Sequence, residues 1–523
     1  MIIPFARRAL LAALTFAAAV GGALAAWHYH RLGLTLSHYD ARGHLVVARR
    51  IVDSITPGWQ QVGAVWLPLP HLLNAIPVQV DLFYRTGASA VAISIASYAI
   101  AAGAIGWILL MLTGSAIAAV GGAAVFALNP NVVYLQSTPM TEPLLLATTT
   151  VAVAMLIGWS LAHPDNAGPE PFDAPLILSP SKDERLAQDR LVEGRADPRC
   201  VGTAFALACL TRYEAWPVTV SALAAAAWVL WRRDRALAPA ARDVAGIALY
   251  PAVAIAGYAI FSRVVIGVWF LPSGFFVPEN KALGDPMMAA AEIGWGARML
   301  SGAALTWLGA SGLAIALGFG LASRRRAEML LPVALLGMAA IPWTAFLNGH
   351  PFRIRYMVPL MAAEAIGAGL VAGVLPDRRL RSVVATALLV LAAYELKPLD
   401  ASAPMVVEAQ WDRPNAPVRA RVTACLGRPA RGEKIMASMG SLGHYMQEAS
   451  GSGFAIRDFL HEGNGDIWLA ALNGARPYVA WVLLEEKAEG GDMLARLAHE
   501  KPALLEGYQR VCEGAGLVLY RRD

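Results

Sequence analysis

The feature that most constrains this chain is a series of long apolar stretches that carry almost no charge. Residues 88–110, for example, contain no Asp, Glu, Lys or Arg. A helix needs roughly 20 apolar residues to cross about 30 Å of hydrocarbon. Charged residues make up only 15% of the 523 residues, whereas soluble domains usually carry about 25%. The sequence therefore predicts a polytopic α-helical membrane protein and excludes a single soluble core.

About eleven membrane-spanning segments are expected from these runs. We place them at 8–27, 88–110, 112–128, 142–162, 200–211, 215–231, 244–268, 296–321, 328–347, 356–375 and 381–397. The segments 112–128 and 200–211 are short, so we expect them to be partly buried among neighbours. The first run ends in a small-residue pattern that resembles a cleavage site. A cleaved signal peptide is therefore the alternative to the retained helix that we favour.

The basic residues indicate how these segments are oriented. Short cytoplasmic loops are enriched in Lys and Arg. Counting crossings from an inside N-terminus places four loops inside: 163–199, 232–243, 322–327 and 376–380. The same count places outside the segments 28–87, 129–141, 269–295, 348–355 and everything after about 398. We expect a multi-pass protein of the inner (cytoplasmic) membrane. The net charge of +5 reflects these basic loops, and without aromatic–basic interleaving a nucleic-acid partner is excluded.

Composition divides the chain into two parts. A transmembrane module is expected over 1–397, with a structured outer loop at 28–87 and a mobile cytoplasmic insertion, a solvated tether, at 163–199. The region 398–523 has ordinary soluble composition, and we expect it to form a small α/β domain facing the periplasm or exterior. Its expected elements are strands at 434–440 and 478–486, helices at 415–427, 464–474 and 491–500, and a terminal hairpin at 507–522.

The four cysteines carry no metal-binding spacing. Cys200 and Cys209 lie in or beside a predicted span, and we interpret them as structural. Cys425 and Cys512 both fall in the soluble region. If that region faces an oxidising compartment, the two can pair as a disulfide. No metal site is predicted.

The first outer loop begins with an amphipathic helix. Val47, Ile51 and Ile55 share one face with His44, while arginines and Asp53 form a polar side. We expect this helix to lie on the outer leaflet, with Trp59 and Trp66 in the headgroup belt. The alternative is that the loop caps the bundle and serves only packing.

Two carboxylates at the outer ends of spans are candidates for chemistry. Ionisable groups at the rim of a membrane bundle are costly and mark functional sites by default. Asp40 follows the first span and begins the amphipathic helix, where it is either a general base or a simple N-cap. Glu142 opens the fourth span, where it is either a second site carboxylate or a first-turn acid that stabilises the helix dipole.

Several cationic and polar residues are expected at the same outer rim. They are Arg212 and Glu214 in one turn, Arg353, Arg355 and Tyr356 with His350 in another, and His44 in the first outer loop. We predict that this group binds the substrate, and in particular a donor phosphate. For Arg353 and Arg355, pairing with lipid headgroups is the alternative.

This set of residues suits a reaction on an anionic, lipid-linked substrate. In a polyprenyl-phosphate sugar the leaving group is a phosphate, which departs without a strong general acid. The reaction needs a base for the acceptor hydroxyl and cations on the departing phosphate. Asp40 fits the base, and Arg353 or Arg355 fits the clamp.

With these residues the chain resembles the GT-C glycosyltransferases, in particular the protein O-mannosyltransferase and aminoarabinose-transferase branch. The resemblance rests on "HYDARGH" after the first span, "GAVWLPLPHLL" in the long outer loop, and the "NP" turn followed by "MTEPLLL". The "RYE" turn at 212–214 and the "RIRY" turn at 353–356 are similar to family positions. Many relatives carry an acidic pair where this chain has Asp40 followed by Ala41, which affects the expected metal dependence and substrate.

The resemblance implies a GT-C-like fold over about 1–400 and an inverting sugar transfer at the outer face. It implies that Asp40 is the base and that Glu142 is a second carboxylate at the acceptor site. The expected partners are a polyprenyl-phosphate-linked sugar, membrane lipids and an acceptor, which is a protein, lipid or glycan. No cofactor is implied; a divalent metal is compatible with this chemistry but is not indicated by the residues.

Two other functions compete with this hypothesis. Transporters and lipid flippases usually place polar sites near the midplane, on broken helices of repeated halves, whereas the polar residues here gather at the outer rim. A non-catalytic envelope-assembly protein on the same scaffold is the third class.

Overall fold

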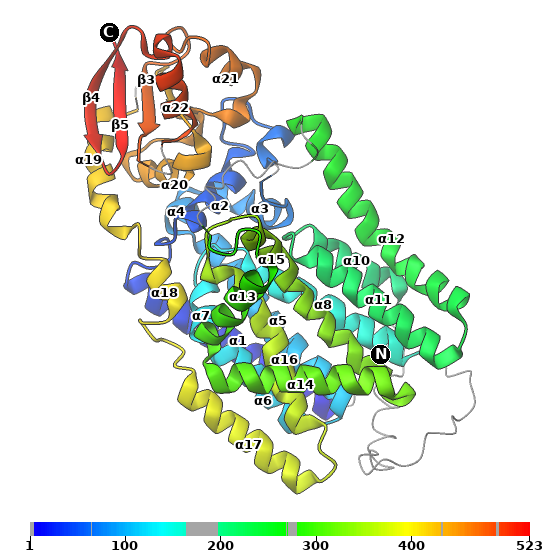
Figure 1. Cartoon of the computed structure of the whole chain (residues 1–523). Helices are drawn as coiled ribbons and strands as arrows, with labels where there is room; N and C mark the ends of the chain where they lie inside the picture. Colours follow the sequence, from blue (N-terminus) through cyan, green and yellow to red (C-terminus); the bar gives the residue numbers. More distant parts are fainter. Residues whose placement is uncertain are drawn as a thin grey trace.

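The computed structural model describes residues 5–63, 65–163, 197–267, 269, 280–429, 432–487 and 491–523. The helices of the membrane module are α1 (Phe5–Arg31), α5 (Ala88–Thr113), α6 (Ala116–Leu128), α8 (Glu142–Leu161), α10 (Pro198–Cys209), α11 (Ala215–Asp234), α12 (Leu237–Phe261), α13 (Pro286–Ser301), α14 (Ala303–Ala322), α15 (Ala340–Leu347), α16 (Leu360–Gly373) and α17 (Arg378–Glu395). Figure 1 shows them as one bundle, with the C-terminal domain at one end.

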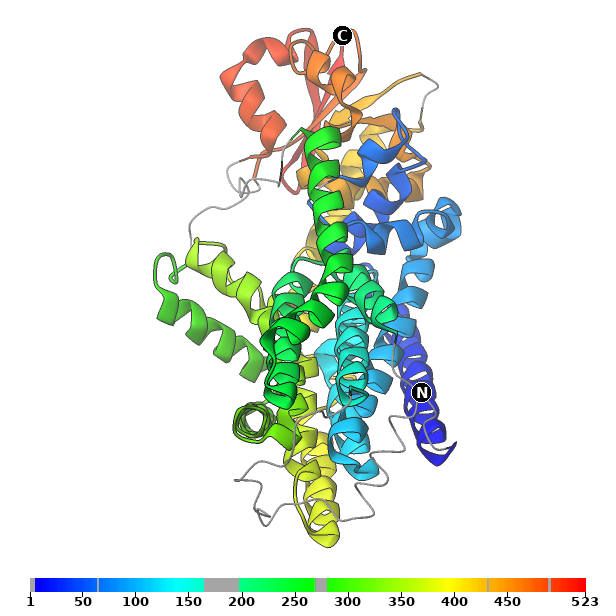
Figure 2. The same cartoon turned by 90° about the vertical axis from the view of Figure 1, so that its right-hand side faces the viewer.

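Shorter helical elements complete the membrane module and the end of it that faces the C-terminal domain. They are α2 (Tyr39–Arg50), η1 (Trp59–Val62), α3 (Leu69–Asn74), η2 (Pro77–Gln79), α4 (Asp81–Thr86), α7 (Pro130–Leu135), η3 (Ser262–Ile266), η4 (Arg324–Ala339), η5 (Ile354–Met357), α18 (Pro404–Glu408) and η6 (Arg413–Asn415). Seen from the side, the bundle and the C-terminal domain form one elongated molecule (Figure 2).

The predicted class of a multi-pass helical membrane protein is confirmed. Within the described residues, six stretches are long and apolar enough to cross a membrane: Ala6–Arg31, Ala88–Thr113, Glu142–Leu161, Leu237–Ile266, Ala303–Ala322 and Arg324–Leu347. Two shorter apolar helices, Ala116–Leu128 and Leu360–Gly373, lie among them. Each predicted span falls on helical structure, but the count of eleven crossings stays a prediction. Most of the predicted insertion at 163–199 lies outside the described residues.

One predicted span is wrong as a single helix. The segment 296–321 is divided into α13 and α14 at Gly302, whose φ is +83°. A side chain is strained at such a φ, and a Cβ there would also meet the carboxylate of Glu395 on α17. The hydropathy of the segment does not reveal this break, because both helices are apolar.

The expected position of the amphipathic helix on the outer leaflet is also wrong. The apolar residues Leu45 and Val46 of α2 are fully buried and share one core with Leu442, Tyr445 and Leu483 of the C-terminal domain. Figure 1 shows α2, α3 and α4 between the bundle and that domain. The periodicity correctly predicted an apolar face, but another protein surface covers it instead of lipid.

The two tryptophans of the outer loop lie in different environments. Trp59 is exposed, whereas the ring of Trp66 lies 4.1 Å from that of His44, measured between centroids. Trp66 therefore packs against His44, and the predicted place of both tryptophans in the headgroup belt stays a prediction.

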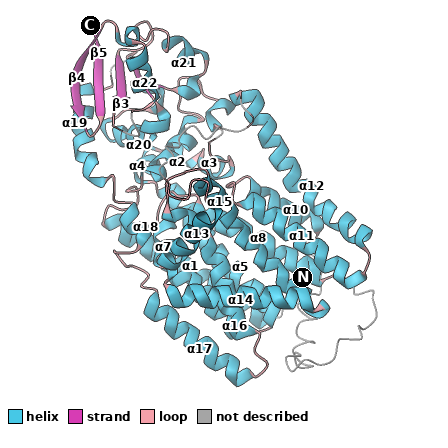
Figure 3. Cartoon of the chain, in the orientation of Figure 1, coloured by secondary structure: helices cyan, strands magenta, loops and turns pink. Residues whose placement is uncertain are grey.

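The C-terminal domain is built on one five-stranded sheet with the order β2-β1-β3-β5-β4. The strands are β1 (Ile435–Ala437), β2 (Phe459–Leu460), β3 (Trp481–Glu485), β4 (Tyr508–Gly514) and β5 (Leu517–Arg522). β1 pairs in parallel with β2 and β3, and β5 is antiparallel to β3 and β4. All described strands lie in this domain (Figure 3).

Helices pack against this sheet. They are α19 (Ala416–Leu426), α20 (Met439–Ala449), α21 (Asp466–Ala471) and α22 (Met493–Glu500), with short turns η7 (Ser450–Ser452), η8 (Ile456–Asp458), η9 (Glu462–Asn464) and η11 (Pro502–Leu505). The predicted strands, helices and terminal hairpin are confirmed, with Ala515 and Gly516 at positive φ in the hairpin turn. Sequence reasoning missed α20 and the two-residue strand β2.

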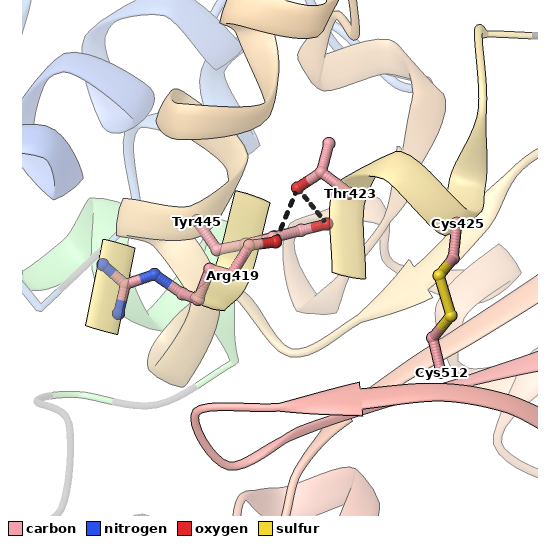
Figure 4. Close-up of a disulfide and its surroundings, with 5 residues drawn as sticks. All are labelled: Arg419, Thr423, Cys425, Tyr445 and Cys512. Atoms are coloured by element: carbon pink, nitrogen blue, oxygen red, sulfur yellow. Dashed lines mark hydrogen bonds between the residues drawn. A yellow bond between two sulfur atoms is a disulfide. The ribbon is translucent and has the colours of Figure 1, made fainter. Parts of the chain in front are cut away.

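A disulfide joins Cys425 of α19 to Cys512 of β4, with 6.5 Å between the Cα atoms (Figure 4). The pairing that the sequence left conditional is therefore present. Close by, the hydroxyl of Thr423 donates to the carbonyl of Arg419 and lies 3.1 Å from the hydroxyl of Tyr445. The bridge ties the helix that leads into the domain to its last hairpin.

Removing this disulfide is expected to destabilise the C-terminal domain. The bridge closes a loop of 87 residues, and loss of a native disulfide typically costs about 2–5 kcal/mol. The thermal midpoint of Cys512→Ser should therefore fall below that of the wild type, and a reductant should lower the wild-type midpoint in the same way. Cys200→Ser is the control, because Cys200 is exposed and unpaired. Equal midpoints for the two variants would contradict the prediction.

Candidate active site at the domain-facing end of the bundle

Asp40 is the second residue of α2 and is almost fully buried. The N-cap of this helix is His38, whose Nδ1 accepts a hydrogen bond from the backbone N–H of Asp40 at 3.2 Å. The alternative that Asp40 is a simple N-cap is therefore wrong. Because the side chain of Asp40 does not cap the helix, its carboxylate can bind a partner outside α2.

That carboxylate forms an ion pair with Arg355, the second residue of η5. Burial alone would raise the pKa of Asp40, but Arg355, His38 and His44 together lower it to about 2. Asp40 is therefore ionised at neutral pH and competent to accept a proton. While the ion pair lasts, however, its affinity for that proton is held low.

A second charged group forms where α8 begins. Arg212 has its Nη1 3.1 Å from Oε1 of Glu142 and its Nη2 2.7 Å from Oε1 of Glu214. It also donates to the hydroxyl of Thr141 at 2.9 Å. Glu142 is fully buried, and among the described residues neither of its carboxylate oxygens receives a hydrogen bond. Burial alone would lower the pKa of Arg212, but the two carboxylates raise it.

The two charged groups belong to one site. The charge of Arg355 acts on the pKa of Arg212 and lowers it, which places the two guanidinium groups within electrostatic range. His44 is within range of both, since Asp40 raises its pKa while Arg212 and Arg355 lower it. Elements far apart in the chain thus bring the predicted carboxylates and arginines to one end of the bundle.

His44 is held by a second histidine. Nδ1 of His71 lies 3.2 Å from the carbonyl of Leu67, so it donates there and leaves Nε2 as an acceptor. Nε2 of His71 lies 3.1 Å from Nδ1 of His44, which must then be the donor. Burial and His71 lower the pKa of His44 well below its usual value. Neutral His44 therefore presents Nε2 as an acceptor, which suits a substrate hydroxyl better than a phosphate.

Lowering the pH from 7 to 5 is expected to destabilise the protein through His71. Burial and Arg50 lower the pKa of His71 to about 3, whereas an unfolded histidine titrates near about 6.5. Because the folded state disfavours the proton, stability is full above about 6.5 and falls as the pH drops towards the folded pKa. The thermal midpoint should fall across this range, and fall less in His71→Gln. Equal slopes for the two proteins would contradict this role.

A cavity of about 250 Å³ opens beside the Asp40–Arg355 pair. It is lined by Ser37, His38, Tyr39, Arg353, Arg355, Glu408, Ala409, Trp411, Asp412 and Asn415. Arg353 lies with its guanidinium 6.0 Å from the centre of the Trp411 ring. Among the described residues it forms no hydrogen bond or ion pair, so its charge is available to a ligand.

His350 and Tyr356 lie at the edge of the site and contact each other. The hydroxyl of Tyr356 is 3.2 Å from Nε2 of His350, and the Arg355 guanidinium lies 5.3 Å from the Tyr356 ring. Neither residue lines the cavity. The predicted substrate-binding role of both residues stays a prediction.

Sequence reasoning missed the residues that complete the cavity wall. His38 and Tyr39 directly precede Asp40, and Glu408 and Trp411 follow the last predicted span. The segment that holds Glu408 and Trp411 was assigned to the soluble domain by its composition. A Trp-Asp pair next to a short Pro-initiated helix was the available signal. In the part of the chain that the structure describes, no three His, Cys, Asp or Glu side chains converge as metal ligands.

Comparison with solved structures decides the fold. No protein-family model and no curated protein matches this sequence. A structure of ArnT from Cupriavidus metallidurans bound to undecaprenyl phosphate matches 96% of this chain and 97% of its own, with a TM-score of 0.56 and 13% identity. The chain has the GT-C fold. The fold that the sequence resemblance implied is thereby confirmed.

A second structure with the GT-C fold is similar over less of its length. It is an oligosaccharyltransferase from Archaeoglobus fulgidus in complex with zinc and sulfate. The match covers 97% of this chain and 73% of that one, at 13% identity. Its TM-score is 0.45. In the GT-C fold of this chain, the Asp40 and Glu142 groups lie together at the end of the bundle that faces the C-terminal domain.

Proposed function

We propose that this chain is an inverting glycosyltransferase that moves a sugar from a polyprenyl-phosphate donor to an acceptor hydroxyl at the outer face of the membrane. The observation that carries the proposal is the buried Asp40–Arg355 ion pair beside a cavity that also exposes the charge of Arg353. A base and a phosphate clamp are the two groups that such a transfer needs. The bound undecaprenyl phosphate of the ArnT structure supports a lipid phosphate as the partner.

The donor phosphate competes with Asp40 for Arg355. When the phosphate enters, Arg355 turns from the carboxylate to the incoming anion, and Arg353 adds a second cation. Asp40 then loses the charge that depresses its pKa most, so its proton affinity rises as the substrate arrives. In this way the resting ion pair keeps Asp40 ionised, and donor binding converts it into an effective base.

The transfer step then balances without a further reactant. The acceptor oxygen attacks the anomeric carbon opposite the phosphate, and its proton passes to Asp40. The bond from the anomeric carbon to the phosphate oxygen breaks, and the electron pair stays on the departing polyprenyl phosphate. Arg353 and Arg355 stabilise that developing charge. Attack from the opposite face inverts the anomeric centre. To Glu142, which is held by Arg212, we assign the role of orienting the acceptor.

Two further observations support the outer face of the inner membrane as the place of reaction. The Cys425–Cys512 disulfide lies in the domain beside the site, and disulfides persist in oxidising compartments such as the periplasm. The connection between α16 and α17 ends at Asp377, and Arg378 and Arg379 begin α17. This connection lies at the end of the bundle away from that domain (Figure 1). Basic loops are typical of the cytoplasmic side.

The proposal is tested with purified protein in lipid nanodiscs. A labelled polyprenyl-phosphate sugar is added together with a cell-envelope fraction as the source of acceptor. We expect the label to leave the donor lipid and to appear in the acceptor fraction. Movement of intact donor across a bilayer without chemical change would instead favour a flippase, and an inserted wild-type protein that consumes no donor would contradict the proposal.

A further inference from the structure

One wall of the cavity comes from the segment between the last membrane helix and the C-terminal domain. This segment, residues 404–415, contains α18 and η6. It is attached to the bundle: the hydroxyl of Ser37 donates to the carbonyl of Ala409 at 2.7 Å, and Asn131 of α7 accepts from the N–H of Met405 at 3.0 Å. Both contacts are buried, so the segment is a fixed part of the site.

Glu408 carries an unsatisfied polar atom in this wall. Its side chain is only 6% exposed. Within the described residues its Oε1 receives no hydrogen bond, and Nε2 of His38 is 3.7 Å away. A buried carboxylate oxygen without a donor is costly. Its place on the cavity indicates that a ligand supplies the missing donor.

Trp411 supplies a different kind of surface. Trp411 is 63% exposed although it lines the cavity, and Arg353 lies over its ring. The negative face of an aromatic ring attracts the weakly positive C–H bonds of a neighbour. The C–H face of a sugar ring presents such bonds in a plane, with its hydroxyl groups at the edge.

The charges of the cavity specify the rest of the ligand. Asp412 is held by Arg419 through two hydrogen bonds of 2.8 and 2.7 Å, and Asp40 is held by Arg355. Arg353 and Glu408 are left without a hydrogen-bonded partner of opposite charge among the described residues. The cavity therefore suits a ligand with an anion at one end, hydrogen-bond donors at the other and an apolar face between them. A sugar joined to a phosphate has this arrangement.

We propose that residues 404–415 form the subsite that recognises the transferred sugar. Glu408 accepts hydrogen bonds from hydroxyl or amino groups of that sugar, and Trp411 stacks on its C–H face, while Arg353 lies on the phosphate side. Glu408 is thus a specificity-determining residue of the reaction. The inference rests on the proposed function, because it assigns the donor sugar to this cavity.

The test compares the bare lipid phosphate with three lipids that differ from it only by a sugar. Affinities are measured in nanodiscs for undecaprenyl phosphate and for undecaprenyl phosphate linked to mannose, glucose or 4-amino-4-deoxyarabinose. In Glu408→Gln and Trp411→Ala, affinity for the sugar-bearing lipid that the wild type prefers should fall tenfold or more. Affinity for undecaprenyl phosphate should stay within twofold. Arg353→Gln should weaken the binding of both the sugar-bearing lipid and undecaprenyl phosphate. Gln410→Ala, on the same segment but outside the cavity lining, is the control and should change neither.

Two results would overturn the subsite. Either both lipids weaken equally in Glu408→Gln and Trp411→Ala, which indicates a structural role, or neither lipid changes. If wild-type protein still consumes labelled donor in either case, the subsite fails while the proposed function stands. A wild type that neither consumes donor nor distinguishes any of the three sugar-bearing lipids from undecaprenyl phosphate overturns both.

Discussion

Replacing Asp40 with Asn is expected to lower kcat by about 10²–10⁴-fold, the usual contribution of a general base. The amide keeps the shape of the side chain but cannot accept the proton of the acceptor hydroxyl. Because Asp40 pairs with Arg355 in the resting site, the variant also frees that guanidinium for the donor phosphate. The KM for the donor should therefore stay constant or fall while kcat collapses.

The matched control for this variant is Asp53→Asn. Asp53 lies just beyond α2, where it pairs with Arg49 at 2.9 Å and with Arg457 at 3.5 Å. It joins the outer loop to the C-terminal domain, so its replacement should lower the thermal midpoint and leave kcat nearly unchanged. An Asp40→Asn protein that inserts normally and turns over at the wild-type rate would show that Asp40 is not the base.

Replacing Arg355 with Gln is expected to change both the rate and its pH dependence. Loss of one cation from the phosphate should lower kcat/KM at pH 7 by about 10²–10³-fold, as for other groups that stabilise developing charge. The charge of Arg355 is the one that lowers the pKa of Asp40 most, so in its absence burial would raise that pKa. The acid limb of kcat/KM, which reports the free enzyme, should move to higher pH.

This shift of the acid limb distinguishes the role of Arg355 from that of Arg353. In the wild type the pKa of Asp40 is about 2, so no limb from Asp40 is expected between about pH 4 and 8. Arg355, followed by His38 and His44, supplies the largest charge effects that lower this pKa. Arg353→Gln should therefore weaken the binding of the donor and leave the acid limb of kcat/KM at the same pH. The same acid limb in wild type and Arg355→Gln would contradict the ion pair as the control of the base.

The charged centre of the site was predictable from the sequence for a physical reason. Asp40, Glu142, Arg212 and Arg355 stand at the ends of apolar runs, and the alternation of crossings places those ends on the same side of the membrane. The hydropathy pattern thus constrains where such residues lie before any packing is known. The same pattern predicted the multi-pass helical class and the separate composition of the C-terminal domain.

The parts that were missed depend on contacts between distant residues. Ser37 and Ala409 are 372 positions apart, and nothing local in either sequence indicates that they meet over a cavity. Glu408 and Trp411 therefore appeared to belong to the soluble domain. The apolar face of α2 was visible in the sequence, but whether lipid or protein covers such a face is decided by its partner, here α20. The break at Gly302 depends in the same way on Glu395 of another helix.

The most direct test of the central claim is the amount of polyprenyl phosphate released from a labelled polyprenyl-phosphate sugar by the wild-type protein in nanodiscs with an envelope fraction present. We expect one polyprenyl phosphate for each sugar transferred, and release at least 100-fold slower with Asp40→Asn. Donor that stays intact in the presence of folded, inserted wild-type protein, or equal release by the two proteins, would contradict sugar transfer at this site.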